Sequence, residues 1–171
     1  MAVNRCAIAL GSNLGDSLAI LRGAIATLDQ HSNVAVTQVS SVYQTAPVGG
    51  PPQPDILNAC ALLKSDLSPE SLLRLLLLVE TEFGRVRRER WGARLLDLDL
   101  LLVGEQQLKT PILELPHPRM WERAFVLVPL AEIAPQWCNP LSGQAIADIR
   151  ATLSDDGITR LTDAQSWLKA P

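Results

Sequence analysis

The amino-acid sequence predicts an α+β fold in which an antiparallel sheet is packed against helices. Short apolar or β-branched runs alternate with two segments of helical spacing, and glycine- or proline-rich breaks separate them. The order of the segments is strand, helix, strand, strand, helix, strand. This is the split βαβ order of ferredoxin-like folds, and the βαββαβ core predicts a four-stranded antiparallel sheet with two helices on one face.

The first strand and the first helix are separated by a turn. Residues 6–10 form a short apolar run that predicts a buried strand. Asp16 or Ser17 can cap the helix that follows, because both side chains can accept a backbone hydrogen bond. Apolar residues then recur at helical spacing to about Asp29, which predicts an amphipathic helix.

The middle of the chain predicts two strands and the second helix. Residues 34–43 are rich in Val, Thr and Ser and favour a strand, and residues 56–64 favour another. The segment 45–55 between them contains four prolines, so it is predicted to be a loop. Ser68 and Pro69 are typical of a helix start, and this helix is expected to end at Gly84.

The last core strand is an apolar run at residues 95–103 that contains two acids. Beyond it we expect a C-terminal helical and loop extension. A helix is predicted at residues 121–132, where Pro129 should end or kink it, and shorter helices are predicted at residues 142–153 and 163–168.

The length and composition indicate one globular domain, residues 1–171. The net charge of −3 argues against a nucleic-acid partner, since such surfaces usually carry a basic excess. The 3 cysteines are far apart in the sequence, which disfavours a disulfide framework or a zinc site. No apolar run has the length of a bilayer span and the first ten residues do not resemble a signal peptide, so we expect a cytoplasmic protein without a membrane partner.

Two acids alternate with leucines in the last predicted core strand, in the order Leu96-Asp97-Leu98-Asp99-Leu100. Side chains alternate between the faces of a strand, so Asp97 and Asp99 should share one face and the leucines the other. Adjacent carboxylates repel each other, and a magnesium ion, which prefers oxygen ligands and often shares them with substrate phosphates, relieves that repulsion. The pair is therefore a candidate metal site, with a solvated acidic face as the alternative.

A basic loop leads directly into this strand. Guanidinium groups bind phosphate oxygens through paired hydrogen bonds, although a solvated charge run is the alternative. Cations next to paired acids supply the charge neutralisation and positioning that phosphoryl transfer requires. Trp91, in the same loop, is either a hydrophobic anchor or a flat face for a planar ring. The arginines of the loop are Arg85, Arg87, Arg88, Arg90 and Arg94.

Two further polar residues are candidates for ligand contacts. The amide of Asn58 offers a donor and an acceptor that suit the edge of a heterocycle, with a half-exposed strand residue as the alternative. His117 lies between two prolines, so its backbone is stiff, and its ring can donate a hydrogen bond to phosphate. A purely structural histidine is the alternative there. The turn at residues 11–15 matches neither a Walker loop nor a dinucleotide fingerprint, and we interpret it as a capped strand-to-helix turn.

Taken together, these segments resemble the 6-hydroxymethyl-7,8-dihydropterin pyrophosphokinase family of folate biosynthesis, over residues 8–135. The most specific match is the stretch at residues 90–101, Arg-Trp-Gly-Ala-Arg-Leu-Leu-Asp-Leu-Asp-Leu-Leu, which is similar to the family's signature. Further segments occur in the family's order, namely residues 11–15, 43–45, 53–58, 84–87, 116–118 and 129–135.

The resemblance implies an enzyme in which the pterin hydroxyl attacks the β-phosphorus of ATP, so that AMP leaves and the pterin diphosphate forms. It implies that Asp97 and Asp99 hold two magnesium ions and that Arg85 and Arg94 stabilise the transferring group, these four being the catalytic residues. The ATP-binding residues that it implies are Glu80, Arg85, Arg87, Trp91, Arg94, His117 and Arg123. The pterin-binding residues that it implies are Thr45, Val48, Ile56, Asn58, Trp91, Asp97 and Phe125, with Phe125 as the stacking face.

The sequence departs from the family pattern at a few positions. Ile56 stands where an aromatic residue is common, so apolar contact replaces ring stacking there, and Pro118 stands where some members have tyrosine. Residues 109–115 match the family only weakly. Two alternatives remain open: another magnesium-dependent phosphotransferase that releases ADP, and a non-catalytic nucleotide- or pterin-binding module of the same fold. We expect a monomer with ATP and the pterin as its partners.

Overall fold

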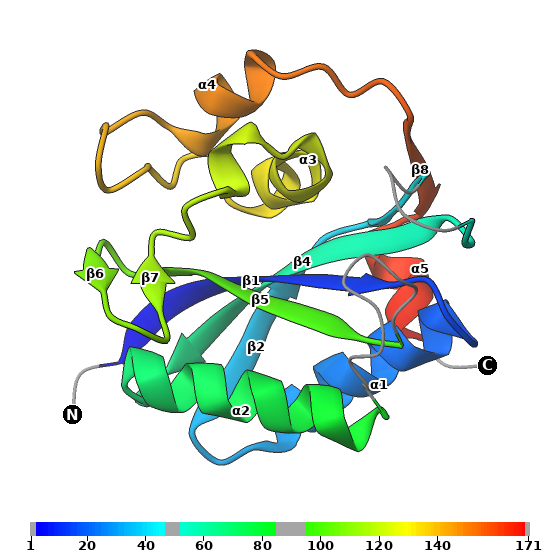
Figure 1. Cartoon of the computed structure of the whole chain (residues 1–171), viewed down its shortest axis with the longest axis horizontal. Helices are drawn as coiled ribbons and strands as arrows, with labels where there is room; N and C mark the ends of the chain where they lie inside the picture. The colour runs from blue at the N-terminus through cyan, green and yellow to red at the C-terminus, as the bar shows by residue number, and fades with distance from the viewer. Residues whose placement is uncertain (1–2, 47–51, 85–94, 170–171) are drawn as a thin grey trace.

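The computed structural model describes residues 3–46, 52–84 and 95–169, and these form a sheet between two layers of helices (Figure 1). Among these residues the main sheet has 6 strands in the order β5-β1-β4-β3-β8, and β2 also pairs with β4. The centre is formed by β1 (Asn4–Ser12), which is antiparallel to both β4 (Ile56–Ser65) and β5 (Asp97–Val103). The predicted ferredoxin-like order is confirmed, because β1, α1, β2 with β3, β4, α2 and β5 follow one another along the chain.

The sheet is larger than the four strands that the sequence predicted. The single strand expected at residues 34–43 is divided at Ser40 and Ser41 into β2 (Val34–Val39) and β3 (Val42–Thr45), which lie one after the other along β4. The strand β8 (Ile158–Thr162) then pairs with the outer edge of β3. It escaped prediction because it is short, mostly exposed and shows no apolar alternation.

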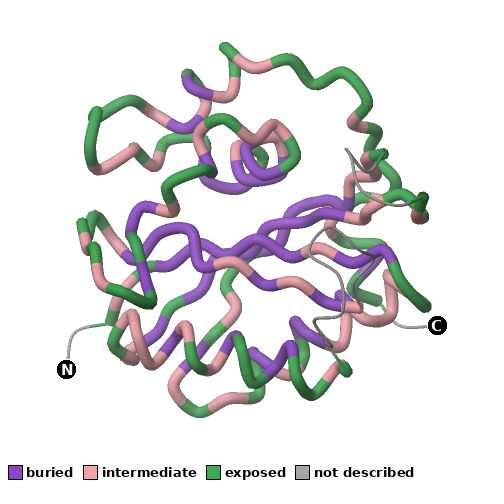
Figure 2. The backbone as a smooth tube through the Cα atoms, in the orientation of Figure 1, coloured by how far each residue is buried: buried purple, intermediate pink, exposed green. Residues whose placement is uncertain are grey.

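One face of the sheet is covered by α1 (Ser17–Gln30) and α2 (Pro69–Glu82). Both helix starts are as predicted: Asp16 accepts a hydrogen bond from Ala19 N at 3.2 Å, and Ser68 accepts one from Ser71 N at 3.2 Å. The apolar stripes of both helices meet apolar residues of β1 and β5 in one buried cluster. In Figure 2 the buried residues are the purple stretches of the strands and helices.

The opposite face is covered by η1 (Met120–Glu122), α3 (Ala124–Ile133) and α4 (Ile146–Ala151), which belong to the C-terminal extension that the sequence predicted without placing it on a face. Buried residues of α3 pack against small side chains of the sheet, including Ala7, Ala9 and Cys60. The physical reason is visible in β1, which is buried continuously rather than at alternate positions. Continuous burial requires cover on both faces of a sheet.

Pro129 does not end the predicted helix, because α3 continues past it to Ile133. Proline costs a helix one backbone donor. Here Val126, Leu127 and Leu130 are buried against the sheet, and this packing holds the helix together across the proline. The predicted helices at residues 142–153 and 163–168 are present as the shorter α4 and α5 (Ala164–Leu168).

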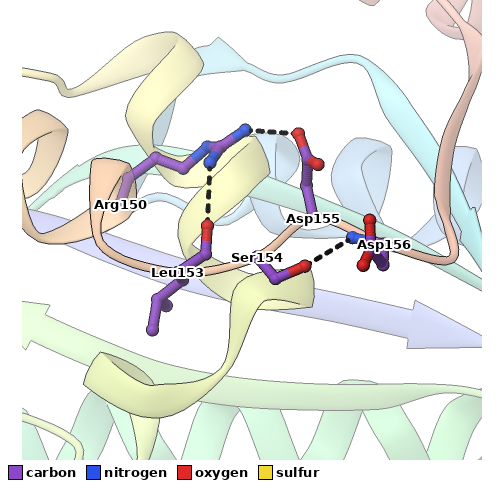
Figure 3. Close-up of polar contacts among 5 residues, drawn as sticks. All are labelled: Arg150, Leu153, Ser154, Asp155 and Asp156. Atoms are coloured by element: carbon purple, nitrogen blue, oxygen red, sulfur yellow. Dashed lines mark hydrogen bonds and ion pairs between the residues drawn. The ribbon is translucent and has the colours of Figure 1, made fainter.

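The C-terminal extension passes from one face of the sheet to the other. After α4 the chain turns toward β8, and Figure 3 shows how this turn is fixed: Arg150 Nη2 donates to Asp155 Oδ2 at 2.9 Å, and Asp156 N donates to Ser154 Oγ at 3.2 Å. Beyond β8, α5 buries Trp167 in the α1 and α2 side of the core, with 1% of its surface exposed. The extension therefore wraps the β3 edge of the sheet.

Two short strands complete the described chain. A hairpin of β6 (Leu108–Lys109) and β7 (Glu114–Leu115) follows β5 and was not predicted. No helix within the described ranges is both long and apolar enough to cross a membrane.

Candidate active site

The acid pair lies on β5, at an edge of the described sheet. Asp97 and Asp99 pair in register with Gly11 and Ala9 of β1, and both aspartates are half-buried. The intervening Leu98 is buried against α1 and α2. The alternation predicted from the sequence is therefore confirmed, and the carboxylates project from the face that carries α3.

A single row of register partners crosses four strands of the sheet. It runs from Asp97 on β5 through Gly11 on β1 and Asn58 on β4 to Tyr43 on β3. Direct partners in antiparallel strands point to the same face, so the side chains of Asp97 and Asn58 lie on the same face of the sheet. With adjacent strands about 4.8 Å apart, Asp97 and Asn58 are separated by roughly 10 Å.

Gly11 keeps the space between these two side chains open. A Cβ at this position would lie 3.5 Å from Asn58 Oδ1 and 3.9 Å from Ile56 Cγ2, in ordinary contact with both. Any larger side chain would therefore fill the surface above β1. The sequence signal was an apolar run that stops at a glycine, but the run alone does not reveal that this glycine separates an acid from an amide.

The amide of Asn58 is held in one orientation. Its side chain is 7% exposed, and Nδ2 donates to Thr45 Oγ1 at 2.9 Å. Oδ1 then lies on the side of Gly11. Ile56 lies one step further along the same face of β4, paired with Thr45 of β3. The structure thus brings together Thr45, Ile56, Asn58 and Asp97 from the predicted pterin-binding set.

Glu80 is buried in α2, with 2% of its surface exposed. Its Oε2 accepts a hydrogen bond from Leu98 N at 2.6 Å. Leu98 lies between the two aspartates, so the buried carboxylate fixes the backbone of β5 at the acid pair. The contact with ATP implied by the family resemblance stays a prediction for this residue.

His117 lies beside β5, the strand that carries the acid pair. Its backbone N donates to Leu101 O at 2.9 Å, and its Nδ1 accepts from Arg119 N at 3.2 Å. Burial, followed by the positive charges of Arg123 and Arg119, lowers the pKa of His117, against the opposing effect of Glu114 and Asp97. The ring is therefore neutral near pH 7, with its proton on Nε2 as a hydrogen-bond donor.

The start of α3 supplies a cation and an aromatic face. The guanidinium carbon of Arg123 lies 5.7 Å from the centroid of the Phe125 ring, a cation–π distance that orients the arginine. Phe125 is 39% exposed, which is unusual for a large aromatic residue on an otherwise apolar helix. An exposed ring at this position is available to stack against a planar ligand.

Five predicted site residues lie outside the described ranges: Val48, Arg85, Arg87, Trp91 and Arg94. The residues that flank the arginine segment are described. A Cβ on Gly84 would lie 3.1 Å from Leu95 Cδ1, and a Cβ on Gly15 would lie 3.3 Å from Leu95 Cδ2. Gly84 and Leu95 therefore lie beside each other, and Leu95 also lies beside Gly15 in the turn after β1.

A buried asparagine that the sequence analysis did not single out connects two loops near the site. Asn13 is 6% exposed, and its Nδ2 donates to Gln53 Oε1 at 2.7 Å and to Pro54 O at 3.0 Å. This links the turn after β1 to the proline-rich loop before β4. Its only sequence signal was its place in the glycine turn.

Comparison with known proteins identifies the family of this site. The sequence model of 7,8-dihydro-6-hydroxymethylpterin-pyrophosphokinase (HPPK) matches residues 7–135. The chain belongs to the HPPK family. All of the predicted site residues lie within the matched region, and α4, β8 and α5 lie beyond it.

Individual relatives agree with this assignment. The chain is 49% identical over 142 residues to the 2-amino-4-hydroxy-6-hydroxymethyldihydropteridine pyrophosphokinase of Synechocystis sp., covering 83% of this chain and 72% of the relative. It is 41% identical over 162 residues to the enzyme of that name from Pseudomonas aeruginosa, covering 95% and 99% of the two chains. The HPPK assignment thus holds for the chain nearly end to end.

Solved structures show the same fold at low sequence identity. An HPPK-DHPS in complex with substrates superposes with a TM-score of 0.70 at 10% identity, covering 89% of this chain. The Plasmodium falciparum HPPK-DHPS A437G/K540E with pterin and p-hydroxybenzoate gives a TM-score of 0.72 at 12% identity, covering 93%. This chain spans only 43% and 47% of those two proteins.

Proposed function

We propose that this chain transfers the pyrophosphoryl group of ATP to the hydroxymethyl group of 6-hydroxymethyl-7,8-dihydropterin at the row of residues that joins Asp97 to Asn58. The reaction, a step of folate biosynthesis, follows from membership of the HPPK family and from relatives of this enzyme name that are 49% and 52% identical. The single observation that supports the location is the row itself, which places a paired acid and an oriented amide on one open face.

Magnesium is the metal that the acid pair would hold. Asp97 and Asp99 offer hard oxygen ligands on one face of a strand, and no cluster of three or more metal-ligating side chains occurs among the described residues. A site with few protein ligands suits magnesium, which keeps waters and shares substrate phosphate oxygens. When bound, two such ions would neutralise the charge of the triphosphate.

The residues around β5 would position the nucleotide. His117, neutral at physiological pH, would donate from Nε2 to a phosphate oxygen, and Arg123 would add a positive charge at the start of α3. Arg85 and Arg94 are proposed to stabilise the transferring group, and Arg87, Trp91 and Glu80 to complete the ATP site. The pterin oxygen forms a bond to the β-phosphorus, the bond from that phosphorus to the α-phosphate oxygen breaks, and AMP leaves.

The residues of β3 and β4 would position the pterin. The fixed amide of Asn58 presents an acceptor to the heterocycle edge, and Ile56 and Thr45 line the same face. Phe125, which is 39% exposed at the start of α3, would provide an aromatic face for stacking. Val48, Trp91 and Asp97 complete the proposed pterin site.

We further propose that residues 1–171 act as one monomeric domain in the cytoplasm, without a nucleic-acid or membrane partner. The acidic balance of the chain supports the first exclusion. The continuous sheet from β5 to β8 supports a single domain, because residues of this one sheet contribute to both buried clusters.

Separation of nucleotides after incubation with ATP, magnesium and the pterin tests the proposed reaction. AMP formed in step with the pterin diphosphate is the expected result. Pterin-dependent ADP would instead identify another phosphotransferase. A folded protein that binds magnesium-ATP and the pterin without forming any product would be a binding module.

A further inference from the structure

The bend between β2 and β3 is a buried polar junction. Ser40 and Ser41 are 0% and 1% exposed, and buried polar groups need hydrogen-bond partners. Ser40 N donates to Cys60 O at 2.9 Å, and Ser40 Oγ accepts from Cys60 N at 2.8 Å. From the other side of the sheet, Trp167 Nε1 donates to Ser40 O at 2.9 Å. The bend is therefore tied to β4 and to α5.

A third tie comes from Glu132, near the end of α3. Its carboxylate accepts hydrogen bonds from Ser41 N at 3.0 Å, from Ser41 Oγ at 2.8 Å and from Tyr43 Oη at 2.7 Å. Glu132 as a whole residue is exposed, so water alone would satisfy its charge. An exposed carboxylate that nonetheless accepts from three donors on one segment has a specific geometric role.

The segment that Glu132 holds leads directly into the proposed pterin site. Tyr43 is the end of the row that contains Asn58, and Thr45 is two residues further along β3 on the same face. Thr45 Oγ1 accepts the hydrogen bond that orients Asn58. The strand β3 has only 4 residues, so its position depends strongly on how its first residues are held.

We propose that Glu132 is a positioning residue for the pterin side of the active site: it fixes the start of β3 from α3, so that Thr45 holds the Asn58 amide toward the ligand. The inference rests on the proposed role of Asn58 in pterin binding. The hydrogen bonds of Glu132 go to Ser41 and Tyr43, and two strands, β1 and β4, separate β3 from the acid pair on β5. Loss of Glu132 should therefore weaken pterin binding and spare the ATP side.

Steady-state kinetics of Glu132→Gln separate these effects. The variant keeps the shape of the side chain and removes the charge, so the KM for the pterin should rise about tenfold while the KM for ATP changes less than about twofold. Tyr43→Phe removes one of the three donors to Glu132, and its pterin KM should rise by about threefold. Glu105→Gln, an exposed glutamate in the turn after β5, is the matched control and should match the wild type.

The chain contains 1 tyrosine, so phenolate absorbance reports on Tyr43 alone. Burial, then the hydrogen bond and charge of Glu132, raise the pKa of Tyr43 to about 12, against an opposing effect of Arg160. The wild-type phenol should stay protonated at a pH where free tyrosine ionises, and Glu132→Gln should ionise at lower pH. The pH titration of this absorbance therefore shows whether a folded variant has lost the contact between Tyr43 and residue 132.

A Glu132→Gln variant that folds, shows the lowered tyrosine pKa and keeps the wild-type pterin KM would overturn the positioning role. An equal rise in both KM values would do the same. If Glu132→Gln does not fold, Tyr43→Phe decides, and an unchanged pterin KM there overturns the role. A wild type that forms no pterin-dependent AMP would contradict the proposed function instead, so the two failures are distinguishable.

Discussion

The two ends of the active-site row are held in opposite ways. At the β5 end, two half-buried carboxylates lie side by side, and buried Glu80 fixes the backbone between them. At the β3 and β4 end, neutral groups are oriented by hydrogen bonds, from Asn58 to Thr45 and from Tyr43 to Glu132. In the proposed site, the first end would depend on charge and on a bound cation, and the second on the orientation of neutral groups.

The two substrates of the proposed reaction would therefore gain their binding energy from different kinds of interaction. Like charges at close range favour whatever cation relieves them, which suits a triphosphate that arrives with magnesium. A flat, neutral heterocycle gains little from charge and much from a preoriented donor and acceptor. Substitutions at the two ends should therefore change different kinetic constants.

The largest effect is expected at the acid pair. Asp97→Asn and Asp99→Asn should each lower kcat by about 10²- to 10³-fold, because a ligand of the proposed metal is lost. The melting temperature without magnesium should not fall by more than about 3 °C, since one of two repelling charges is removed. Asp148→Asn, an exposed aspartate of α4, is the control. Near-wild-type turnover in either site variant would remove the metal assignment.

A smaller effect is expected at the amide. Asn58→Ala should raise the pterin KM by roughly 10- to 100-fold, because the heterocycle edge loses its partner. Thr45→Val keeps the shape of the strand residue but removes the hydroxyl that orients Asn58, and a rise of about threefold is expected. Initial rates at varied pterin and saturating ATP measure both. The proposed pterin site would be wrong if the ATP KM moved while the pterin KM did not.

The buried Glu80 should contribute mainly to stability. Glu80→Ala leaves Leu98 N without its acceptor, and loss of a hydrogen bond to a charged group should cost about 1.5 to 3 kcal/mol of unfolding free energy. Glu80→Gln retains an oxygen that can accept this bond and should cost less. Urea unfolding of both variants gives the comparison, and equal stabilities would show that the bond to Leu98 is unimportant.

The smallest effect is the pH dependence that His117 imposes. Its folded-state pKa is lowered below 6.5, so the unfolded chain takes up a proton first as the pH falls. The neutral ring of His117 therefore makes its full contribution to the unfolding free energy above pH 6.5. This contribution is lost as the pH falls through the lowered pKa. The unfolding free energy of His117→Gln should therefore vary less between pH 5 and 7 than that of the wild type. Identical slopes for the two proteins would contradict the lowered pKa.

The sequence predicted those features that depend on local patterning. Period two placed Asp97 and Asp99 on one face, and the capping residues Asp16 and Ser68 marked both core helices where they begin. These signals are strong because each is complete within a few neighbouring residues.

Features that depend on distant partners were not predictable in this way. The strand β8 is defined by its pairing with β3 rather than by its own pattern, and Glu132 gains its role only where α3 crosses the bend at Ser41. Gly11 likewise matters because of its neighbours on β4 and β5. In each case the partner lies far away in the sequence, so no local window contains the information.

Equilibrium binding of both ligands to Asp99→Asn and Asn58→Ala tests the separation of the two ends most directly. Calorimetry would measure a non-hydrolysable magnesium-ATP analogue alone, and then the pterin in its saturating presence. The account predicts that Asp99→Asn weakens binding of the nucleotide and leaves the pterin nearly unchanged, whereas Asn58→Ala does the reverse. If each variant weakened both ligands by the same factor, the two ends would not act separately and the account would be contradicted.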